Sequence, residues 1–377
     1  MRLGTLLLAW SLAAFAGVQA GDGSYPAPSN VRGAEYPKIH PDLRVTFRLK
    51  APGAQKMQVV PQNGGLGKSP YEMTRGEDGV WTVTTPPVRP GFHYYHLLID
   101  GVPVNDPGSE TFFGWAKETS GLEVPSQELD FYEARPAPHG EVRIRYYHAG
   151  TTGTLRRAYV YTPPDYDANP KARYPGLYLQ HGSGESERAW TAQGKANFIL
   201  DNLIAAGKAR PMILVMENGD ATKSNAPPSS AGRGAEGFPE LVIRDLIPTI
   251  DSAYRTLADR EHRAIAGLSM GAGQALAIGL ANLDKFACIG GFSGGLREFN
   301  PKTAFGGVFA DPAGFNQRVK LLWLGSGVED RFYASGKAAH QALEKAGIRN
   351  VWFECPGEHE WQVWRRHLAD FAPRLFR

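Results

Sequence analysis

Two different patterns of apolar and polar positions divide the chain. Between Val31 and about Pro125, short runs such as Leu43–Leu49 and Gly79–Thr84 alternate apolar and polar residues with period two, and Phe92–Ile99 has the composition of a further strand. Turns that contain glycine or proline separate these runs. Short strands at this spacing are typical of antiparallel sandwiches, in which alternate side chains face a common core. The pattern predicts a small immunoglobulin-like β-sandwich over residues 31–125.

The pattern changes at about Glu141, after a predicted linker over residues 126–140. Strand-like apolar runs then alternate with stretches of helical periodicity, which predicts a mostly parallel sheet covered by helices on both faces. Two adjacent hairpin-like strands followed by strand–helix repeats are the layout of an α/β-hydrolase, which we expect over residues 141–377. The candidate strands are Val142–His148, Arg157–Thr162, Gly176–Gln180, Met212–Glu217, Arg263–Ala266, Ala287–Phe292, Val319–Leu324 and Asn350–Glu354.

The first residues have the features of a secretory signal peptide. Met1 and Arg2 give a positively charged start, and Leu6–Val18 is an apolar run that is too short to span a bilayer. Val18 and Ala20 are small enough for the −3 and −1 positions of a cleavage site. We therefore expect residues 1–20 to be removed near Ala20, and the protein to be secreted or periplasmic without a membrane anchor.

Composition adds little to this picture. The formal net charge is +3 and no basic arm is present, so the chain does not have the features of a nucleic-acid-binding protein. The segment 232–237 has the spelling Gly-x-Gly-x-x-Gly, but no strand precedes it, so we interpret it as a loop. The two cysteines, Cys288 and Cys355, both lie in or beside predicted buried strands, where free cysteine packs as a small apolar side chain. We favour free thiols over a disulfide.

The pattern Gly-x-Ser-x-Gly, which marks the nucleophile turn of serine hydrolases, occurs twice, at Ser269 and at Ser293. Such a turn needs a strand before the serine and a helix directly after it. A strand precedes Ser269, and the alanine- and leucine-rich run Met270–Leu283 follows it. Ser293 is followed by a loop with glycine and proline. We therefore predict that Ser269 is the nucleophile, and that Ser293 lies at the tip of the next strand and lines the cleft.

The other members of a catalytic triad are expected in the order acid, then histidine. Asp330, beside Glu329, lies in the loop after a predicted strand and is the preferred acid. His359 lies in a loop after the last strand, whereas His340 and His367 lie inside predicted helices. A general base must reach both the serine and the acid, and a loop at the same sheet edge permits this. We predict that His359 is the base.

The oxyanion hole is expected to combine the N–H after the nucleophile, at Met270, with an N–H from the loop after the third strand. That loop has the sequence Gln-His-Gly-Ser-Gly-Glu-Ser over residues 180–186, so Ser183 or Gly184 is the second candidate donor. His181 is expected to orient the loop and to lie near the substrate. Trp190 and Trp361 flank the oxyanion and histidine loops and are candidate stacking surfaces for substrate, or core residues.

Together these motifs resemble those of carbohydrate esterase family 1. The likeness covers about Glu141 to Phe376 and is carried by residues 180–187, 246–250, 262–271, 289–293 and 357–361. This family includes feruloyl esterases, acetylxylan esterases, siderophore esterases and mycolyltransferases, and the resemblance implies the same roles for Ser269, Asp330 and His359. Residues 31–125 are similar to glycogen-binding-type modules. The resemblance leaves open whether this module binds carbohydrate or helps to wall the catalytic cleft. Phe112, Phe113 and Trp115 are candidates for contact with a sugar or with the esterase domain.

The predicted function is that of a secreted serine esterase that releases hydroxycinnamates from plant cell-wall polysaccharide. The alternatives are an acetylxylan or acetyl-sugar esterase, a siderophore esterase, and an inactive hydrolase that only holds glycan. The predicted mechanism needs no metal and no cofactor. The expected partner is an esterified polysaccharide or oligosaccharide, and the sequence does not indicate an oligomeric state.

Overall fold

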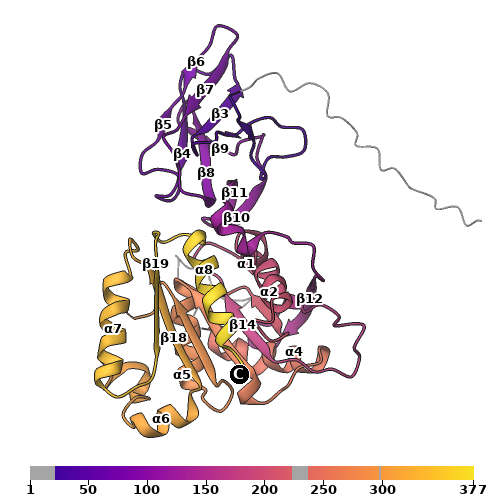
Figure 1. Cartoon of the computed structure of the whole chain (residues 1–377), viewed down its shortest axis with the longest axis vertical. Helices are drawn as coiled ribbons and strands as arrows, with labels where there is room; N and C mark the ends of the chain where they lie inside the picture. The colour runs from indigo at the N-terminus through magenta and orange to yellow at the C-terminus, as the bar shows by residue number, and fades with distance from the viewer. Residues whose placement is uncertain (1–21, 223–236, 297–298) are drawn as a thin grey trace, which may run out of the picture.

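The computed structural model describes residues 22–222, 237–296 and 299–377, which form two bodies in contact (Figure 1). The expected signal peptide and nearly all of the segment 232–237 lie outside the described residues. The N-terminal strands form the upper body and the remaining strands and helices the lower one. Within the described ranges, no helix is both long and apolar enough to cross a bilayer.

The N-terminal body, here called the N-terminal module, consists of two antiparallel sheets around one apolar core. Phe47 from one sheet contacts Tyr95 from the other, with ring centroids 5.0 Å apart. The first strand lies before Val31, where the predicted sandwich begins. It was not predicted because a strand of two residues is too short to show an alternation of apolar and polar positions. One sheet has the order β1 (Tyr25–Pro26), β2 (Lys38–Ile39), β3 (Val45–Lys50), β7 (Val80–Thr84), β6 (Thr74–Arg75). The other has the order β10 (Thr111–Gly114), β11 (Lys117–Val124), β8 (Gly91–Ile99), β4 (Met57–Pro61), β5 (Tyr71–Glu72), with β9 (Val102–Val104) also paired to β8.

The C-terminal body is built on one sheet of eight strands, and each strand overlaps one of the candidate runs. The sheet is mixed, because β13 is antiparallel to both of its neighbours while the remaining pairs are parallel. Five of the seven strand pairs are parallel, so the sheet is mostly parallel, as expected, with β13 as its antiparallel strand. The spatial order is β12 (Glu141–Ala149), β13 (Thr154–Thr162), β15 (Ile213–Glu217), β14 (Gly176–Gln180), β16 (Arg263–Leu268), β17 (Cys288–Phe292), β18 (Leu321–Gly327), β19 (Val351–Cys355).

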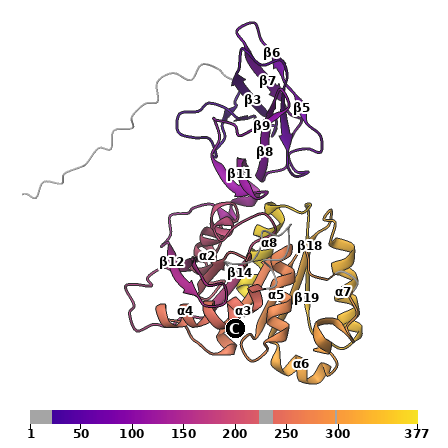
Figure 2. The same cartoon turned by 180° about the vertical axis from the view of Figure 1, so that it is seen from behind.

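Helices cover both faces of this sheet, and a separate apolar cluster fills each interface. Helices α1 (Ala189–Ala192), α2 (Ala196–Ala205) and α8 (Trp361–Phe371) cover one face (Figure 1). The other face is covered by α3 (Phe238–Leu241), η3 (Val242–Leu246), α4 (Ile247–Ala253), α5 (Met270–Ala281), α6 (Pro312–Arg318) and α7 (Tyr333–Lys345) (Figure 2). Single turns complete the described elements at η1 (Gln127–Tyr132), η4 (Arg260–His262), η5 (Ala304–Gly307) and η6 (Ala372–Arg374).

The two bodies share a buried interface. Arg365 of α8 is fully buried, and each of its two terminal nitrogens donates to one oxygen of Glu123 in β11 at 2.8 Å. Phe92 and Tyr94 of β8 belong to the apolar cluster beneath α8 and not to the core of the module. The predicted linker packs as well, since Tyr132 is buried and its ring lies 4.1 Å from the Arg365 guanidinium.

The two cysteines are free and buried, as expected. Cys288 begins β17 and Cys355 ends β19. Burial raises the pKa of each thiol to about 11, so both remain protonated near neutral pH.

Candidate active site

Ser269 lies at a sharp turn between β16 and α5. Its backbone has φ 54° and ψ −114°, a conformation that is costly for a residue with a Cβ and that is typical of a nucleophile elbow. The Ser269 N–H donates to the Phe292 carbonyl at 2.9 Å, which ties the turn to the neighbouring strand. Glycine is required at position 271, since a Cβ there would lie 2.4 Å from the His181 carbonyl oxygen. The turn therefore presents the Ser269 hydroxyl at the carboxyl edge of the sheet.

His359 connects Ser269 to Asp330. Its Nε2 lies 2.8 Å from Ser269 Oγ, and its Nδ1 lies 2.9 Å from Asp330 Oδ2. Asp330 follows β18 and His359 lies between β19 and α8, so the two loops meet at the same edge of the sheet as the elbow. The structure thus brings together the three side chains that were selected from three distant segments. His340 instead lies in α7, stacked on Trp352, and His367 is buried within α8.

The Asp330 carboxylate is held in its charged form. Burial raises its pKa, but this effect is outweighed by the hydrogen bond and the charge of His359 and by the Phe332 N–H, so the pKa lies below the ordinary aspartate value. A charged acid at this position orients the imidazole and stabilises it when it gains a proton. The arrangement permits His359 to accept a proton from Ser269.

The candidate oxyanion donors have amides that are available to a substrate. Met270 is the first residue of α5, and among the described residues no acceptor is found for its N–H. The same holds for the Ser183 and Gly184 amides within the described part of the chain. The Gly182 N–H, in contrast, donates to Glu185 Oε2 at 3.1 Å. The amides that have no acceptor within the described ranges, those of Met270, Ser183 and Gly184, are therefore the ones predicted from the sequence to form the oxyanion hole.

His181 holds this loop in place and does not reach the cleft. It is buried, its Nε2 accepts from the Gly219 N–H at 3.0 Å, and its Nδ1 therefore carries the proton and donates to the Gly182 carbonyl at 2.8 Å. Burial lowers its pKa and keeps the ring neutral. The expected orienting role fits this geometry, whereas a direct substrate contact does not.

A cavity of about 640 Å³ opens above Ser269, and both bodies line it. Four aromatic side chains contribute to its wall, two from the N-terminal module and two from α8. Trp115, one of the aromatic residues singled out in the module, is 57% exposed and lies at the tip of the β10–β11 hairpin. The lining includes Gln62, Asn63, Gly64, Tyr94, Trp115, Ala116, Ser183, Gly184, Glu185, Ser269, Glu329, Arg331, His359, Trp361 and Trp364.

Two residues expected at the substrate are part of the interior instead. Trp190 is fully buried, donates its Nε1–H to the Gln180 carbonyl at 2.9 Å and packs against Trp361. Ser293 is 1% exposed and is absent from the cavity wall. The Ser293 hydroxyl lies close enough to Asp330 to help lower its pKa. The contact between the two side chains does not meet the geometry of a regular hydrogen bond. Of the two tryptophans expected beside the oxyanion and histidine loops, Trp361 lines the cavity and Trp190 does not.

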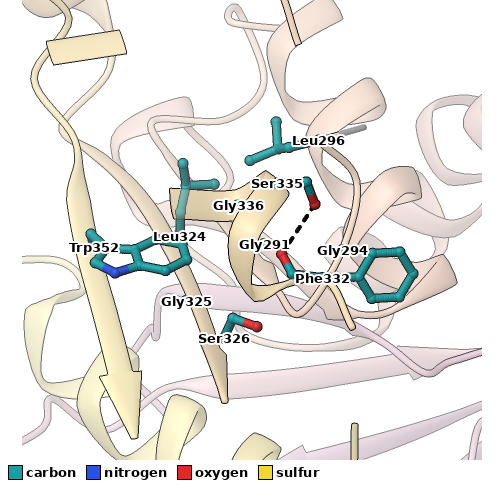
Figure 3. Close-up of a pocket in the computed structure, with 10 residues that line it drawn as sticks. All are labelled: Gly291, Gly294, Leu296, Leu324, Gly325, Ser326, Phe332, Ser335, Gly336 and Trp352. Atoms are coloured by element: carbon teal, nitrogen blue, oxygen red, sulfur yellow. Dashed lines mark hydrogen bonds between the residues drawn. The ribbon is translucent and has the colours of Figure 1, made fainter. Parts of the chain in front are cut away.

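A second, much smaller cavity of about 10 Å³ lies behind the Asp330 loop (Figure 3). Ser326, Leu324 and Trp352 line it together with the start of α7, where the Ser335 hydroxyl donates to the Phe332 carbonyl at 3.1 Å. This volume holds about one water molecule. The cavity above Ser269, which also adjoins His359, is therefore the candidate substrate site.

Sequence reasoning missed several residues of the cavity wall. Tyr94 was hidden in a strand pattern, and Gln62 to Gly64 in an ordinary turn. Glu185 stands in the oxyanion-loop motif, but the sequence gives no signal that Tyr94 and Trp361, from distant segments, will donate to its carboxylate. Within the described residues, no group of three or more His, Cys, Asp or Glu side chains is placed to hold a metal ion.

Comparison with known proteins is consistent with this site. Residues 149–375 match the Esterase family, and the chain belongs to that family. The chain is 39% identical over 359 residues to an endo-1,4-beta-xylanase/feruloyl esterase of Xylanibacter ruminicola, covering 93% of this chain and 47% of that protein. The chain thus spans about half the length of this relative.

Two solved structures share the fold. A ferulic acid esterase from Anaeromyces mucronatus, in complex with ferulic acid, aligns with a TM-score of 0.57 at 24% identity, covering 67% of this chain and 96% of that one. The enterochelin esterase of Shigella flexneri aligns with a TM-score of 0.65 at 17% identity, covering 89% of this chain and 92% of that one. At these identities the likeness concerns the fold alone. The chain thus belongs to an esterase family, and its proposed chemistry follows from the geometry of the site.

Proposed function

We propose that the protein is a serine esterase of the α/β-hydrolase type that releases hydroxycinnamates from esterified plant polysaccharide. The observation that carries this proposal is the chain of contacts from Ser269 to His359 to Asp330, at 2.8 Å and 2.9 Å, beneath a cavity of about 640 Å³. Nucleophile, base and orienting acid are within hydrogen-bond reach of one another, which is what acyl transfer through a covalent intermediate requires.

The proposed reaction has two halves. Ser269 Oγ attacks the ester carbonyl while His359 Nε2 takes its proton, and Asp330 stabilises the resulting imidazolium. The Met270 amide and the amide of Ser183 or Gly184 donate to the developing oxyanion. Collapse of the tetrahedral intermediate breaks the bond to the alcohol oxygen, which receives the proton from His359. Water then attacks the acyl-serine by the same path in reverse, and the free acid leaves.

The size and lining of the cavity favour a large aromatic acyl group. Pockets of about 300–1,000 Å³ suit drug-sized ligands, and an acetyl group would fill only a small part of this one. Its aromatic lining offers faces against which a phenolic ring can stack. The relative of Xylanibacter ruminicola combines xylanase and feruloyl esterase activities in its name, which supports the same substrate class. The aromatic residues of the lining are Tyr94, Trp115, Trp361 and Trp364.

Export and the origin of the N-terminal module belong to the same proposal. Export rests on the signal-peptide pattern of residues 1–20, and it would bring the enzyme to its polymeric substrate. We assign the module to the glycogen-binding type on its sequence motifs. Its contribution to the cavity wall favours a role within the active site over a separate carbohydrate-binding function.

A panel of acyl esters with matched alcohols tests the proposal. The enzyme is expected to hydrolyse methyl ferulate with a higher kcat/KM than methyl acetate, and to release ferulate from arabinoxylan. Preference for acetyl esters and deacetylation of xylan would instead assign an acetylxylan esterase. Ser269→Ala is expected to abolish turnover of every ester, and Ser293→Ala serves as the matched control because it alters the other Gly-x-Ser-x-Gly serine.

A further inference from the structure

Glu185 is a half-buried carboxylate in the cavity wall, and three donors from three parts of the fold converge on it. Its Oε2 accepts from the Gly182 N–H in its own loop at 3.1 Å. Its Oε1 accepts from Trp361 Nε1 of α8 at 2.9 Å and from the Tyr94 hydroxyl of β8 at 3.2 Å. The proposed mechanism gives this side chain no chemical step. Its oxygens nevertheless have three donors, because even partial burial of a carboxylate is costly unless hydrogen bonds satisfy it.

The direction of the Tyr94 contact is fixed by a fourth group. The Gln193 side-chain amide donates to the Tyr94 oxygen, so the Tyr94 O–H is free to donate to Glu185. Burial raises the pKa of Tyr94 well above its ordinary value, which keeps the phenol protonated. Tyr94 therefore acts as a permanent donor that enters the esterase core from the N-terminal module.

A second contact joins the module to the same loop. The Ala116 N–H, at the tip of the β10–β11 hairpin, donates to the Gly184 carbonyl at 2.8 Å. Gly184 has φ +77°, and a Cβ at this position would lie 3.1 Å from the Ala116 nitrogen. The hairpin thus rests directly on the residue whose amide is a candidate oxyanion donor. Both contacts converge on the short segment from Gly182 to Glu185.

We propose that the N-terminal module is a working part of the active site, and that Glu185 is the positioning residue through which Tyr94 holds the oxyanion loop in shape. This inference rests on the proposed esterase function. Oxyanion donors are effective because they are fixed before the reaction begins, so a group that fixes their loop affects the transition state more than the bound substrate. Loss of this anchor therefore lowers kcat more than it raises KM.

The protonation state of Glu185 gives the inference a second readout. Burial raises its pKa to about 7, against the lowering effect of its three donors. Below that pH the carboxyl gains a proton and loses acceptor capacity, so the loop loosens and activity falls on the acid side. The titratable groups around it are Tyr94 from β8 and, lining the same cavity, Glu358, His359 and Glu360 before α8 and Glu329 and Arg331 after β18.

Two variants and one matched control test the inference on a small soluble ester such as methyl ferulate. Glu185→Gln keeps the shape but places an amide N–H₂ against at least one donor, and Tyr94→Phe removes the donor from the module. Tyr95→Phe is the control, because the neighbouring side chain points into the core of the module, where its hydroxyl donates to Asp106 at 2.9 Å. Thermal unfolding of each variant shows whether the fold is intact.

We expect Glu185→Gln to lower kcat by at least about 10-fold with KM changed by less than about 3-fold, since even one lost oxyanion donor costs more than this. The acid side of its pH profile is expected to become less steep, because only the protonation of His359 then remains. Tyr94→Phe is expected to lower kcat by about 5-fold, and Tyr95→Phe to leave it unchanged. Wild-type kcat and pH profile in Glu185→Gln would overturn the inference. So would a Tyr94→Phe effect confined to polymeric arabinoxylan, because this result would assign carbohydrate binding to the module. Ser269→Ala distinguishes failure of this inference from failure of the proposed function. Activity that survives Ser269→Ala would contradict the serine esterase mechanism itself.

Discussion

The buried ion pair between Glu123 and Arg365 gives the sharpest stability prediction. Arg365 has no exposed surface, and its guanidinium is satisfied by Glu123, by the Gln193 carbonyl at 2.9 Å and by the ring of Tyr132. Glu123→Gln keeps the shape and one acceptor but leaves a buried positive charge without a counter-ion. Removal of one partner from a buried ion pair lowers the free energy of unfolding by about 3–5 kcal/mol. Because the glutamine keeps one oxygen that can accept from Arg365, we expect a loss of about 3 kcal/mol for this variant.

Urea unfolding of the full chain, followed by circular dichroism and tryptophan fluorescence, measures this loss. The apolar double variant Glu123→Leu, Arg365→Met removes both charges and is expected to recover at least half of the lost stability, because a buried pair gains little over well-packed apolar residues. A loss below about 1 kcal/mol in Glu123→Gln, or a double variant as unstable as the sum of the single ones, would refute the reasoning.

The same pair predicts a pH dependence with a definite sign. Burial raises the pKa of Glu123, but the charge and hydrogen bonds of Arg365 outweigh this effect, so the pKa in the folded protein is below the ordinary value. A lowered carboxylate pKa stabilises the folded state above the unfolded pKa of about 4.3, and this contribution is lost as the pH falls through the folded value. The difference in stability between the wild type and Glu123→Gln is therefore expected to start shrinking below about pH 4 and to vanish only below the folded pKa of Glu123.

Three further predictions concern residues that the structure moves away from the substrate or keeps from reacting. Ser293→Ala is expected to lower kcat by less than about 5-fold in ester turnover, because a weak contact behind Asp330 is worth about 1 kcal/mol, and a 100-fold loss would place Ser293 in the chemistry. Trp190→Phe is expected to cost about 2 kcal/mol in urea unfolding with KM unchanged, since the ring is buried and donates to Gln180, and a raised KM at native stability would restore it to the substrate site. Cys288 and Cys355 are expected to react with a thiol reagent at pH 8 only after denaturation, because burial raises both pKa values to about 11, and rapid labelling of the native protein would contradict their burial.

Much of this molecule could be predicted because its strands and site loops follow strong local rules. The strand before Ser269 and the helix after it identified the elbow, and loop positions after later strands selected Asp330 and His359 over two helical histidines. These choices needed only the order of elements and the fact that parallel strands end at one edge. The structure places all three side chains in contact.

The features that could not be predicted are how deeply a side chain is buried and which distant segments pack against it. The pattern of residue types along the chain does not encode either of them. Trp190 and Trp361 have similar settings in the sequence, yet only Trp361 reaches the cavity wall. Adjacent tyrosines of β8 point to opposite sides, Tyr94 toward the esterase body and Tyr95 into the module. Strand direction was equally hidden, because the apolar run of β13 is compatible with either orientation beside β15.

The central claim is that Ser269 is the nucleophile and that the similarly spelled Ser293 is not. Reaction of the full chain with a fluorophosphonate, followed by intact mass measurement and peptide mapping, tests this directly, because the probe labels only an activated serine. We expect one adduct on Ser269, with ester hydrolysis lost in proportion to labelling and no adduct in Ser269→Ala. A label on Ser293, or an unlabelled Ser269 in an enzyme that still turns over esters, would contradict it.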